Sequence, residues 1–226
     1  MFSSYPMLST HRKGIYQAFA PSGDVVADER WQAIRLPDGS IQIDNETVRV
    51  APFDEPRSDS MTILLDPQLR LIEFTIHGLF GTRESRICVL GENRDRATIC
   101  WRHKAEIHEK HVAWRDDIEI GWTTPLCVMV TVWRSRLQPG QARTFDAFLL
   151  DAVTFKPTAV RQTYRRQPDE RHVTRFGAMN LQHYEIETDH DGQTHPAANF
   201  WCDDDGVLYN FIASDGARFQ LTAMNV

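Results

Sequence analysis

The last third of the chain consists of short alternating segments separated by Asp-Gly pairs, and this pattern restricts the fold more than any other feature. Between residues 180 and 224, such segments are split by Asp191-Gly192, Asp205-Gly206 and Asp215-Gly216. Asp-Gly between alternating apolar residues is the strongest short-range hairpin signal, because glycine accepts a positive φ angle and aspartate tolerates it. The pattern predicts an antiparallel meander, which must curve around something or have one face covered.

The same pattern continues toward the N-terminus. Residues 14–51 predict a three-stranded meander, with turns at 21–24 and 37–40 and period-2 alternation between 41 and 50. Four more strand candidates lie between 61 and 103, and further strand-like segments follow Gly140. The stretch 105–114 is open between a strand and one or two helical turns, although its β-forming residues favour a strand. Because no linker interrupts the pattern, we expect a loose leader over 1–13 and a single domain over 14–226.

One segment does not follow the strand pattern. A stretch that begins at Pro125 ends just before Pro139-Gly140. Proline in the first turn and Pro-Gly just past the end are typical of a helix. However, the stretch also carries Val128, Val130 and Val132, whose stiff β-branched side chains favour a strand. The residues alone therefore leave this segment open between a helix and a strand.

Charge and composition exclude several classes of protein. The net charge of −6 argues against a general nucleic-acid binder, which needs a clustered basic excess to neutralise phosphates. No stretch approaches the roughly 18 uncharged apolar residues of a membrane span. The first residues lack the apolar core of a signal peptide, and the four cysteines form no CxxC pair. We therefore expect reduced thiols and a cytoplasmic protein.

Residues 123–222 carry an order of elements and aromatic residues that points to a known family. Its landmarks are Thr124-Pro125, Trp133-Arg134, Leu137, Gly140, Phe145, Tyr164, Gly177, Tyr184-Glu185, Phe200-Trp201, Gly206, Gly216, Phe219 and Leu221. This order resembles a bacterial domain family of uncharacterised function with a lipoprotein-carrier-like (LolA/LppX-like) curved sheet. The resemblance implies that residues 125–137 form a helix against the concave face of a half-barrel, and that the sheet encloses an apolar cavity. We therefore expect a mainly β protein: a single curved antiparallel sheet, or open half-barrel, plugged by one helix.

The densest group of candidate metal ligands lies between His103 and His111. It contains three histidines and two glutamates, and such side chains can hold zinc or iron. Their spacing matches no metal motif, and an exposed, charged edge strand explains the group more simply, since charges deter edge-to-edge pairing. The chain also has no nucleophile elbow, phosphate-binding loop, dinucleotide fingerprint or HExxH motif. We expect no metal and no cofactor.

Two His–carboxylate pairs are candidate acid–base catalysts. His183 and Glu185 share one face of a predicted strand with Tyr184 on the other, and His77 shares a face with Glu73. Inside an apolar cavity, a histidine beside a carboxylate could act as a general acid or base. On a half-solvated sheet, the His183 row instead faces water, and this interpretation is favoured. For His77 the residues do not decide.

Aromatic residues are the candidates for ligand contact. Binding pockets are mostly apolar and aromatic with few polar anchors, although each of these residues could equally belong to an ordinary core. Arg134, near the end of the candidate helix, could bind a ligand carboxylate or simply complement the helix dipole. The predicted ligand-binding residues are Trp31, Trp101, Trp122, Trp133, Arg134, Tyr184 and Trp201.

These features support two main hypotheses. The preferred one is a protein that binds a hydrophobic small molecule (a lipid, terpenoid, steroid or polyketide-like compound) in the half-barrel cavity. The alternative is a cofactor-independent isomerase, hydratase or lyase that uses one of the His–carboxylate pairs in the same cavity. A protein-interaction scaffold would instead present a large exposed apolar patch. We expect no nucleic-acid partner and no membrane span, and a homodimer is compatible with the chain.

Overall fold

The structure is a computed structural model that describes residues 11–50, 57–78, 83–91, 93–103 and 105–225. The strands of this described part form one 16-stranded sheet, and its one α-helix is α1 (Pro125–Ser135). The strands are β1 (His11–Phe19), β2 (Val25–Arg35), β3 (Ile41–Arg49), β4 (Arg57–Leu65), β5 (Leu71–Gly78), β6 (Arg83–Leu90), β7 (Arg96–His103), β8 (Glu106–Ala113), β9 (Glu119–Gly121), β10 (Ala142–Leu150), β11 (Pro157–Arg166), β12 (Glu170–Thr174), β13 (Gly177–His190), β14 (Gln193–Cys202), β15 (Leu208–Ile212) and β16 (Arg218–Asn225).

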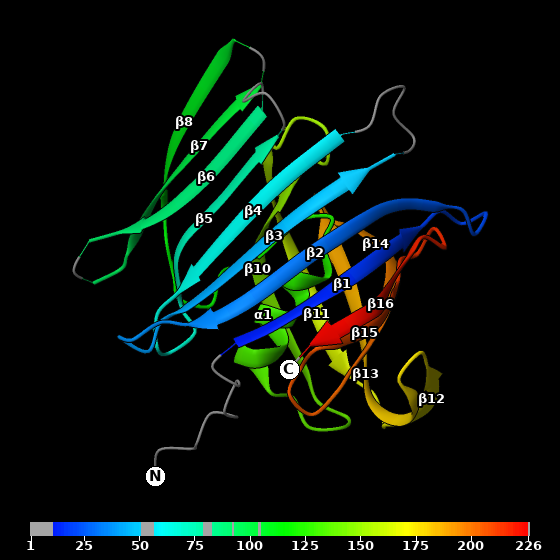
Figure 1. Ribbon diagram of the computed structural model, residues 1–226. Helices are drawn as coiled ribbons and strands as arrows, with labels where there is room; N and C mark the ends of the chain where they lie inside the picture. The colour runs from blue at the N-terminus through cyan, green and yellow to red at the C-terminus, as the bar shows by residue number, and fades with distance from the viewer. Residues whose placement is uncertain (1–10, 51–56, 79–82, 92, 104, 226) are drawn as a thin grey trace.

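The sheet is a single curved surface whose two halves are joined by the pairing of its first and last strands. Strands β1 to β8 pair in chain order, and β1 also pairs with β16, the last strand. The order then runs through β15, β14, β13, β11 and β10 to β9, with β12 attached to β13. Strands β8 and β9 are the two ends, so the sheet stays open (Figure 1). The expected open, curved, mainly β architecture is confirmed, with one parallel pair, β9–β10, in an otherwise antiparallel order.

The Asp-Gly pairs lie in turns, as expected. Asp191 and Gly192 both have positive φ angles, 52° and 76°, and His190 pairs with Gln193 on either side of them. This is the two-residue hairpin turn whose twist matches that of the flanking strands. Gly206 also has a positive φ of 76°, and a Cβ atom there would lie 2.6 Å from Cδ1 of Trp133. At this position glycine is needed both for the turn and for close packing against the helix.

The segment that the residues left open is the helix α1. Thr124 caps its N-terminus, because its Oγ1 accepts a hydrogen bond from the backbone N–H of Leu126. It ends two residues before the expected boundary, since Arg136 adopts the left-handed conformation with φ of 44°. Its valines are compatible with a helix because eight of the eleven α1 side chains are buried, and packing overrides a weak local preference.

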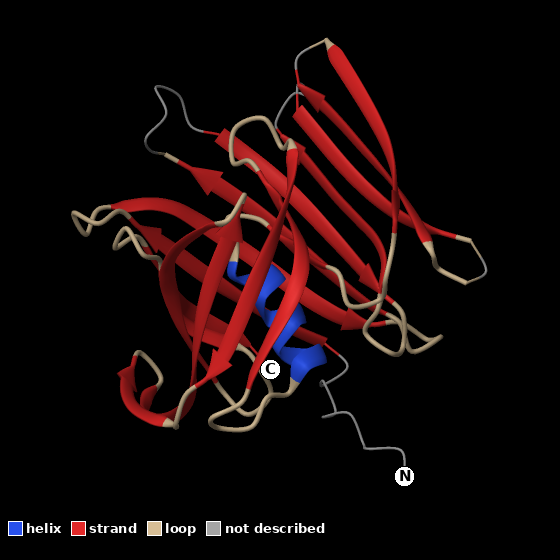
Figure 2. Ribbon diagram, turned by 180° about the vertical axis from the view of Figure 1, so that it is seen from behind, coloured by secondary structure: helices blue, strands red, loops and turns tan. Residues whose placement is uncertain are grey.

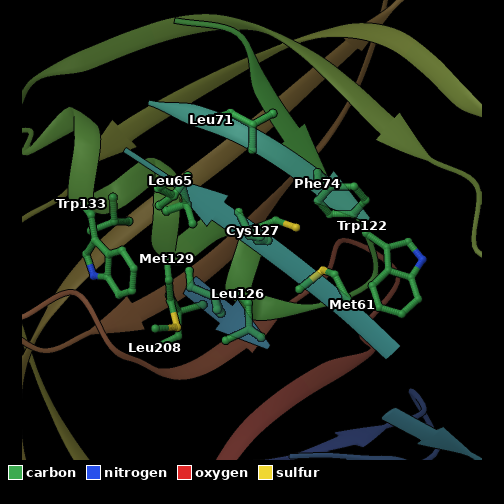
Figure 3. Close-up of a cluster of buried hydrophobic side chains, with 14 of the residues drawn as sticks. Met61, Leu65, Leu71, Phe74, Trp122, Leu126, Cys127, Met129, Trp133 and Leu208 are labelled. Atoms are coloured by element: carbon green, nitrogen blue, oxygen red, sulfur yellow. The ribbon is translucent and has the colours of Figure 1, made fainter. Parts of the chain in front are cut away.

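The core lies between α1 and the concave side of the sheet, where Figure 2 shows the helix enclosed by strands. Inward-facing positions alternate along the strands, as in β5, where Phe74 and Ile76 are fully buried. They belong to the same buried cluster as the helix residues Leu126 and Met129, which are also fully buried and lie near Phe74 in Figure 3. Burying one such side chain stabilises the fold by about 1.5–3 kcal/mol. These contacts fix the position of α1 inside the half-barrel.

Several local features refine the expectations from the sequence. Strand β1 begins at His11 rather than at residue 14. Arg12 is already buried, and its Nη2 pairs with Asp205 at 2.6 Å. Residues 1–10 of the predicted leader lie outside the described part. Segment 106–113 is an edge strand, β8, exposed along most of its length.

Among the described residues, no three His, Cys, Asp or Glu side chains converge on a possible metal position. The four cysteines form no disulfide. No described helix has the length and apolarity that a membrane crossing requires.

Candidate ligand-binding cavity

A cavity of about 790 Å³ opens at the N-terminal end of α1. Its wall is formed by the ends of β1, β3, β10, β13 and β15, the beginnings of β2, β11, β14 and β16, and the segment 120–128 that leads into the helix. The volume falls within the range of about 300–1,000 Å³ typical of small-molecule sites. The helix therefore fills only part of the half-barrel, and the remaining space is accessible from one end.

The interior of the cavity is apolar because the inward-facing positions of its strands carry apolar side chains. On β11, Val160 and Tyr164 face inward, and on β13 Ile186 does so, and all three are buried. Phe211 and Phe219 add an edge-to-face aromatic pair with ring centroids 6.2 Å apart. Such a surface favours a hydrocarbon or ring system over water.

The rim of the cavity, in contrast, is polar. Asp151, His195, Ser214 and Asp215 are exposed there, and other hydroxyl, amide and imidazole groups lie just inside. Asp151 Oδ1 accepts the backbone N–H of Thr154 at 2.7 Å, so this carboxylate also stabilises its own turn. An apolar interior with a hydrogen-bonding rim is complementary to an amphiphile whose tail enters first.

Arg49 is a charged residue of the cavity wall. Its Nη2 donates to the Oγ1 and the carbonyl oxygen of Thr123, at 2.6 and 3.1 Å. Its guanidinium carbon lies 5.0 Å from the ring centroid of Trp122. Behind the wall, Asp59 Oδ2 is 3.6 Å from Arg49 Nε, and Asp59 Oδ1 accepts a 2.6 Å hydrogen bond from Arg83. These contacts hold the guanidinium in one orientation.

Two buried carboxyl groups bracket the helix. Glu29 Oε1 accepts a 2.6 Å hydrogen bond from the hydroxyl of Thr124, the cap of α1. Burial raises the pKa of Glu29 to about 7, against the lowering effects of the Thr124 hydrogen bond and the Arg49 charge. Burial likewise raises the pKa of Glu119 to about 7, although Arg134 Nη1 lies 2.9 Å from its Oε1. Both carboxyl groups can therefore take up or release a proton near neutral pH.

The structure disperses the residues predicted to bind a ligand. Of the seven, only Trp122 lies in the described wall of the cavity. Arg134 is half-buried beside Glu119 and also donates to the carbonyl oxygens of Ile118 and Asp116. The others lie elsewhere: Trp31 stacks on Tyr16, Tyr184 on Phe200, Trp101 on His108 and Trp201 on His183, and Trp133 donates to the carbonyl oxygen of Asp205. Ligand contact by these other residues stays a prediction.

The predicted acid–base residues also lie outside the described wall of the cavity. His77 is exposed on β5, where its Nδ1 is 3.9 Å from Glu84, and Glu73 pairs instead with Arg86. His183 lies on the outer face of β13, with its Nδ1 2.8 Å from Glu170 rather than beside Glu185. Glu185 accepts a 2.8 Å hydrogen bond from Gln167. The structure thus brings none of these four residues together as the expected pairs, and their catalytic role stays a prediction.

Several cavity residues were not singled out from the sequence. Gln162 and Thr188 line the wall because each lies two positions along its strand from a buried inward residue, Tyr164 and Ile186 respectively. Strand alternation from those anchors could have identified them. The same alternation puts Arg49 in phase with Ile43 on β3 and His190 in phase with Ile186 on β13. That these residues and His195 line one cavity depends on how distant strands curve together.

Comparisons with known proteins match this architecture. Solved structures with a similar fold include a DUF1089 family protein from Pseudomonas aeruginosa, with 19% identity, a TM-score of 0.53, and coverage of 81% of this chain and 88% of that one. A β-barrel-like protein of the domain of unknown function DUF1849 from Brucella abortus has 10% identity, a TM-score of 0.63, and coverage of 96% and 97%. At these identities the likeness shows the fold alone. No curated protein matches the chain significantly.

The family assignment comes from the sequence itself. A family model described as "Putative glycolipid-binding" matches residues 26–202, which include most of the sheet, the helix α1 and much of the cavity wall. The expected resemblance to a bacterial domain family of uncharacterised function with a curved sheet is confirmed. Because the match covers well over half of the chain, the protein belongs to this family.

Proposed function

We propose that the protein binds an amphiphilic lipid, with a glycolipid as the leading candidate, in the cavity at the N-terminal end of α1. The apolar part of the ligand lies against Val160, Tyr164 and Ile186, and its polar part lies at the rim. The single observation that carries this proposal is the 790 Å³ space with an apolar interior and a polar rim. The family name supports a sugar-bearing ligand.

The proposal predicts that partly filling the cavity weakens binding. Ala198 lines the cavity on β14, opposite Ile186 in the sheet, so tryptophan in its place would occupy space that the tail needs. Each methylene excluded from the cavity costs about 0.8 kcal/mol, so losing two of them weakens binding roughly tenfold. We expect Ala198→Trp to bind dodecyl maltoside at least tenfold more weakly than the natural chain, measured by calorimetry below the micelle concentration.

Ala159→Trp is the matched control, because Ala159 is exposed on β11 and lies outside the described wall. It introduces the same side chain and should leave the affinity unchanged. Equal affinities for Ala198→Trp, Ala159→Trp and the natural chain would show that the alkyl chain binds elsewhere, and would overturn the proposal.

A further inference from the structure

We propose that Arg49 binds an oxyanion of the ligand, so that amphiphiles carrying a carboxylate or phosphate are preferred over neutral or cationic ones with the same tail. This inference rests on the proposed function, since it concerns the same cavity. It assigns a chemical class to the ligand that neither the fold nor the family description specifies.

The first argument is the orientation of the guanidinium. Nη2 is engaged by Thr123, and Nε is shut off from solvent beside Asp59. Among the described residues, none accepts a hydrogen bond from Nη1. Unlike Nε, this nitrogen keeps some exposure to solvent. Because Arg49 lines the cavity, Nη1 is the part of the guanidinium left to donate into it.

The second argument is the local balance of charge. Asp59 is shared between Arg49 and Arg83, so one buried carboxylate faces two guanidinium groups. Glu29, the nearby second carboxyl, is only partly ionised at neutral pH, because burial raises its pKa to about 7. When Glu29 is protonated, the two arginines and the two carboxyl groups together therefore carry a net positive charge. An incoming oxyanion would neutralise that charge in a site with little water.

The third argument is the lack of a competing cation. Within the described wall, Arg49 is the one arginine or lysine. Its position is fixed by Thr123, by the Trp122 ring and by Asp59, so little side-chain entropy remains to be lost when an anion binds. The rim carboxylates Asp151 and Asp215 are exposed and accept backbone hydrogen bonds in their own turns.

The test compares ligands that share one tail. For the natural chain, we expect affinity to fall from dodecanoate and dodecyl phosphate to dodecyl maltoside, and further to dodecyltrimethylammonium, in calorimetric titrations below micelle concentrations. Inorganic phosphate alone should bind too weakly to detect, which distinguishes an amphiphile's head group from a free anion. In Arg49→Gln, affinity for the two anionic ligands should fall about 10- to 100-fold, as expected for the loss of a charge-assisted hydrogen bond. Affinity for dodecyl maltoside should stay within about twofold.

Arg49→Lys is the conservative variant and should recover part of the anionic preference, because it keeps the charge but not the fork of donors. If Arg49→Gln does not fold, the ligand series on the natural chain decides alone. Equal affinity for anionic, neutral and cationic ligands would overturn the role of Arg49 while leaving the proposed function intact. No binding of any dodecyl ligand would overturn the proposed function itself.

Discussion

Replacing Asp59 with alanine should lower the free energy of unfolding by about 3–5 kcal/mol, the cost of breaking a buried ion pair from one side. The Asp59 side chain is only 1% exposed and accepts a 2.6 Å hydrogen bond from Arg83, with Arg49 on its other oxygen. Removing the carboxylate leaves two guanidinium groups in a region with little water, where the nearby carboxyl Glu29 is only partly ionised. The measurement is urea unfolding followed by far-ultraviolet circular dichroism.

Glu73→Ala is the matched comparison, because Glu73 also pairs with an arginine across neighbouring strands. Its contacts with Arg86, at 2.9 and 3.1 Å, lie between the 2.6 and 3.6 Å contacts of Asp59, but the two side chains are 32% and 52% exposed. Exposed pairs contribute about 0–1 kcal/mol, so this variant should unfold close to the natural chain. Similar losses in Asp59→Ala and Glu73→Ala would contradict the view that burial makes the Asp59 pair essential.

Glu29→Gln should remove a large part of the dependence of stability on pH. In the folded protein the pKa of Glu29 is raised from 4.5 to about 7 by burial. Between these two values the folded state holds a proton that the unfolded state has released, so stability falls as pH rises from about 4.5 to 7 and then levels off. The shift corresponds to a loss on the order of 3 kcal/mol across that window.

Glutamine keeps the oxygen that accepts from Thr124 but cannot ionise, so the variant should be about as stable as the natural chain near pH 5 and more stable at pH 8. Glu119 has a pKa raised in the same direction, so the double variant Glu29→Gln/Glu119→Gln should lose more of this dependence than Glu29→Gln alone. Other ionisable groups beside Glu29 are Arg49, Cys127 and Tyr16, and Asp59 and Arg83 lie behind Arg49. Chemical unfolding at pH 5, 6, 7 and 8 measures the difference. A Glu29→Gln curve parallel to that of the natural chain, with no gain at pH 8, would show that Glu29 is ionised throughout.

The fold was largely predictable because its signals are local. An Asp-Gly pair defines a hairpin by itself, and Asp191-Gly192 forms the expected turn. Alternation over a few residues separated inward from outward positions, as for Tyr184 and Ile186 against His183 and Glu185. The helix α1 was harder to predict from its residues, because its valines favour a strand whereas the prolines at its two ends favour a helix. The helix was predicted from the family resemblance over 123–222.

The site was less predictable because it depends on contacts between distant segments. Arg49 and Thr123 are 74 residues apart, and only the pairing of β1 with β16 brings the first strands beside the C-terminal sheet. The aromatic residues were a poor guide, since tryptophans such as Trp31 and Trp133 fill the core. Histidines near carboxylates were poor guides too, because neighbouring strands place such pairs on the outer face, as with His77 and Glu84.

The central claim is that the space beside the N-terminal end of α1 holds the tail of an amphiphile. The most direct test is a crystal structure with a dodecyl maltoside analogue that carries bromine on the last carbon of its tail. We expect the anomalous bromine peak among Val160, Tyr164 and Ile186, with the sugar at the rim near His195 and Ser214. A bromine peak only on the outer face of the sheet, or a cavity holding only ordered water while the ligand binds elsewhere, would contradict the account.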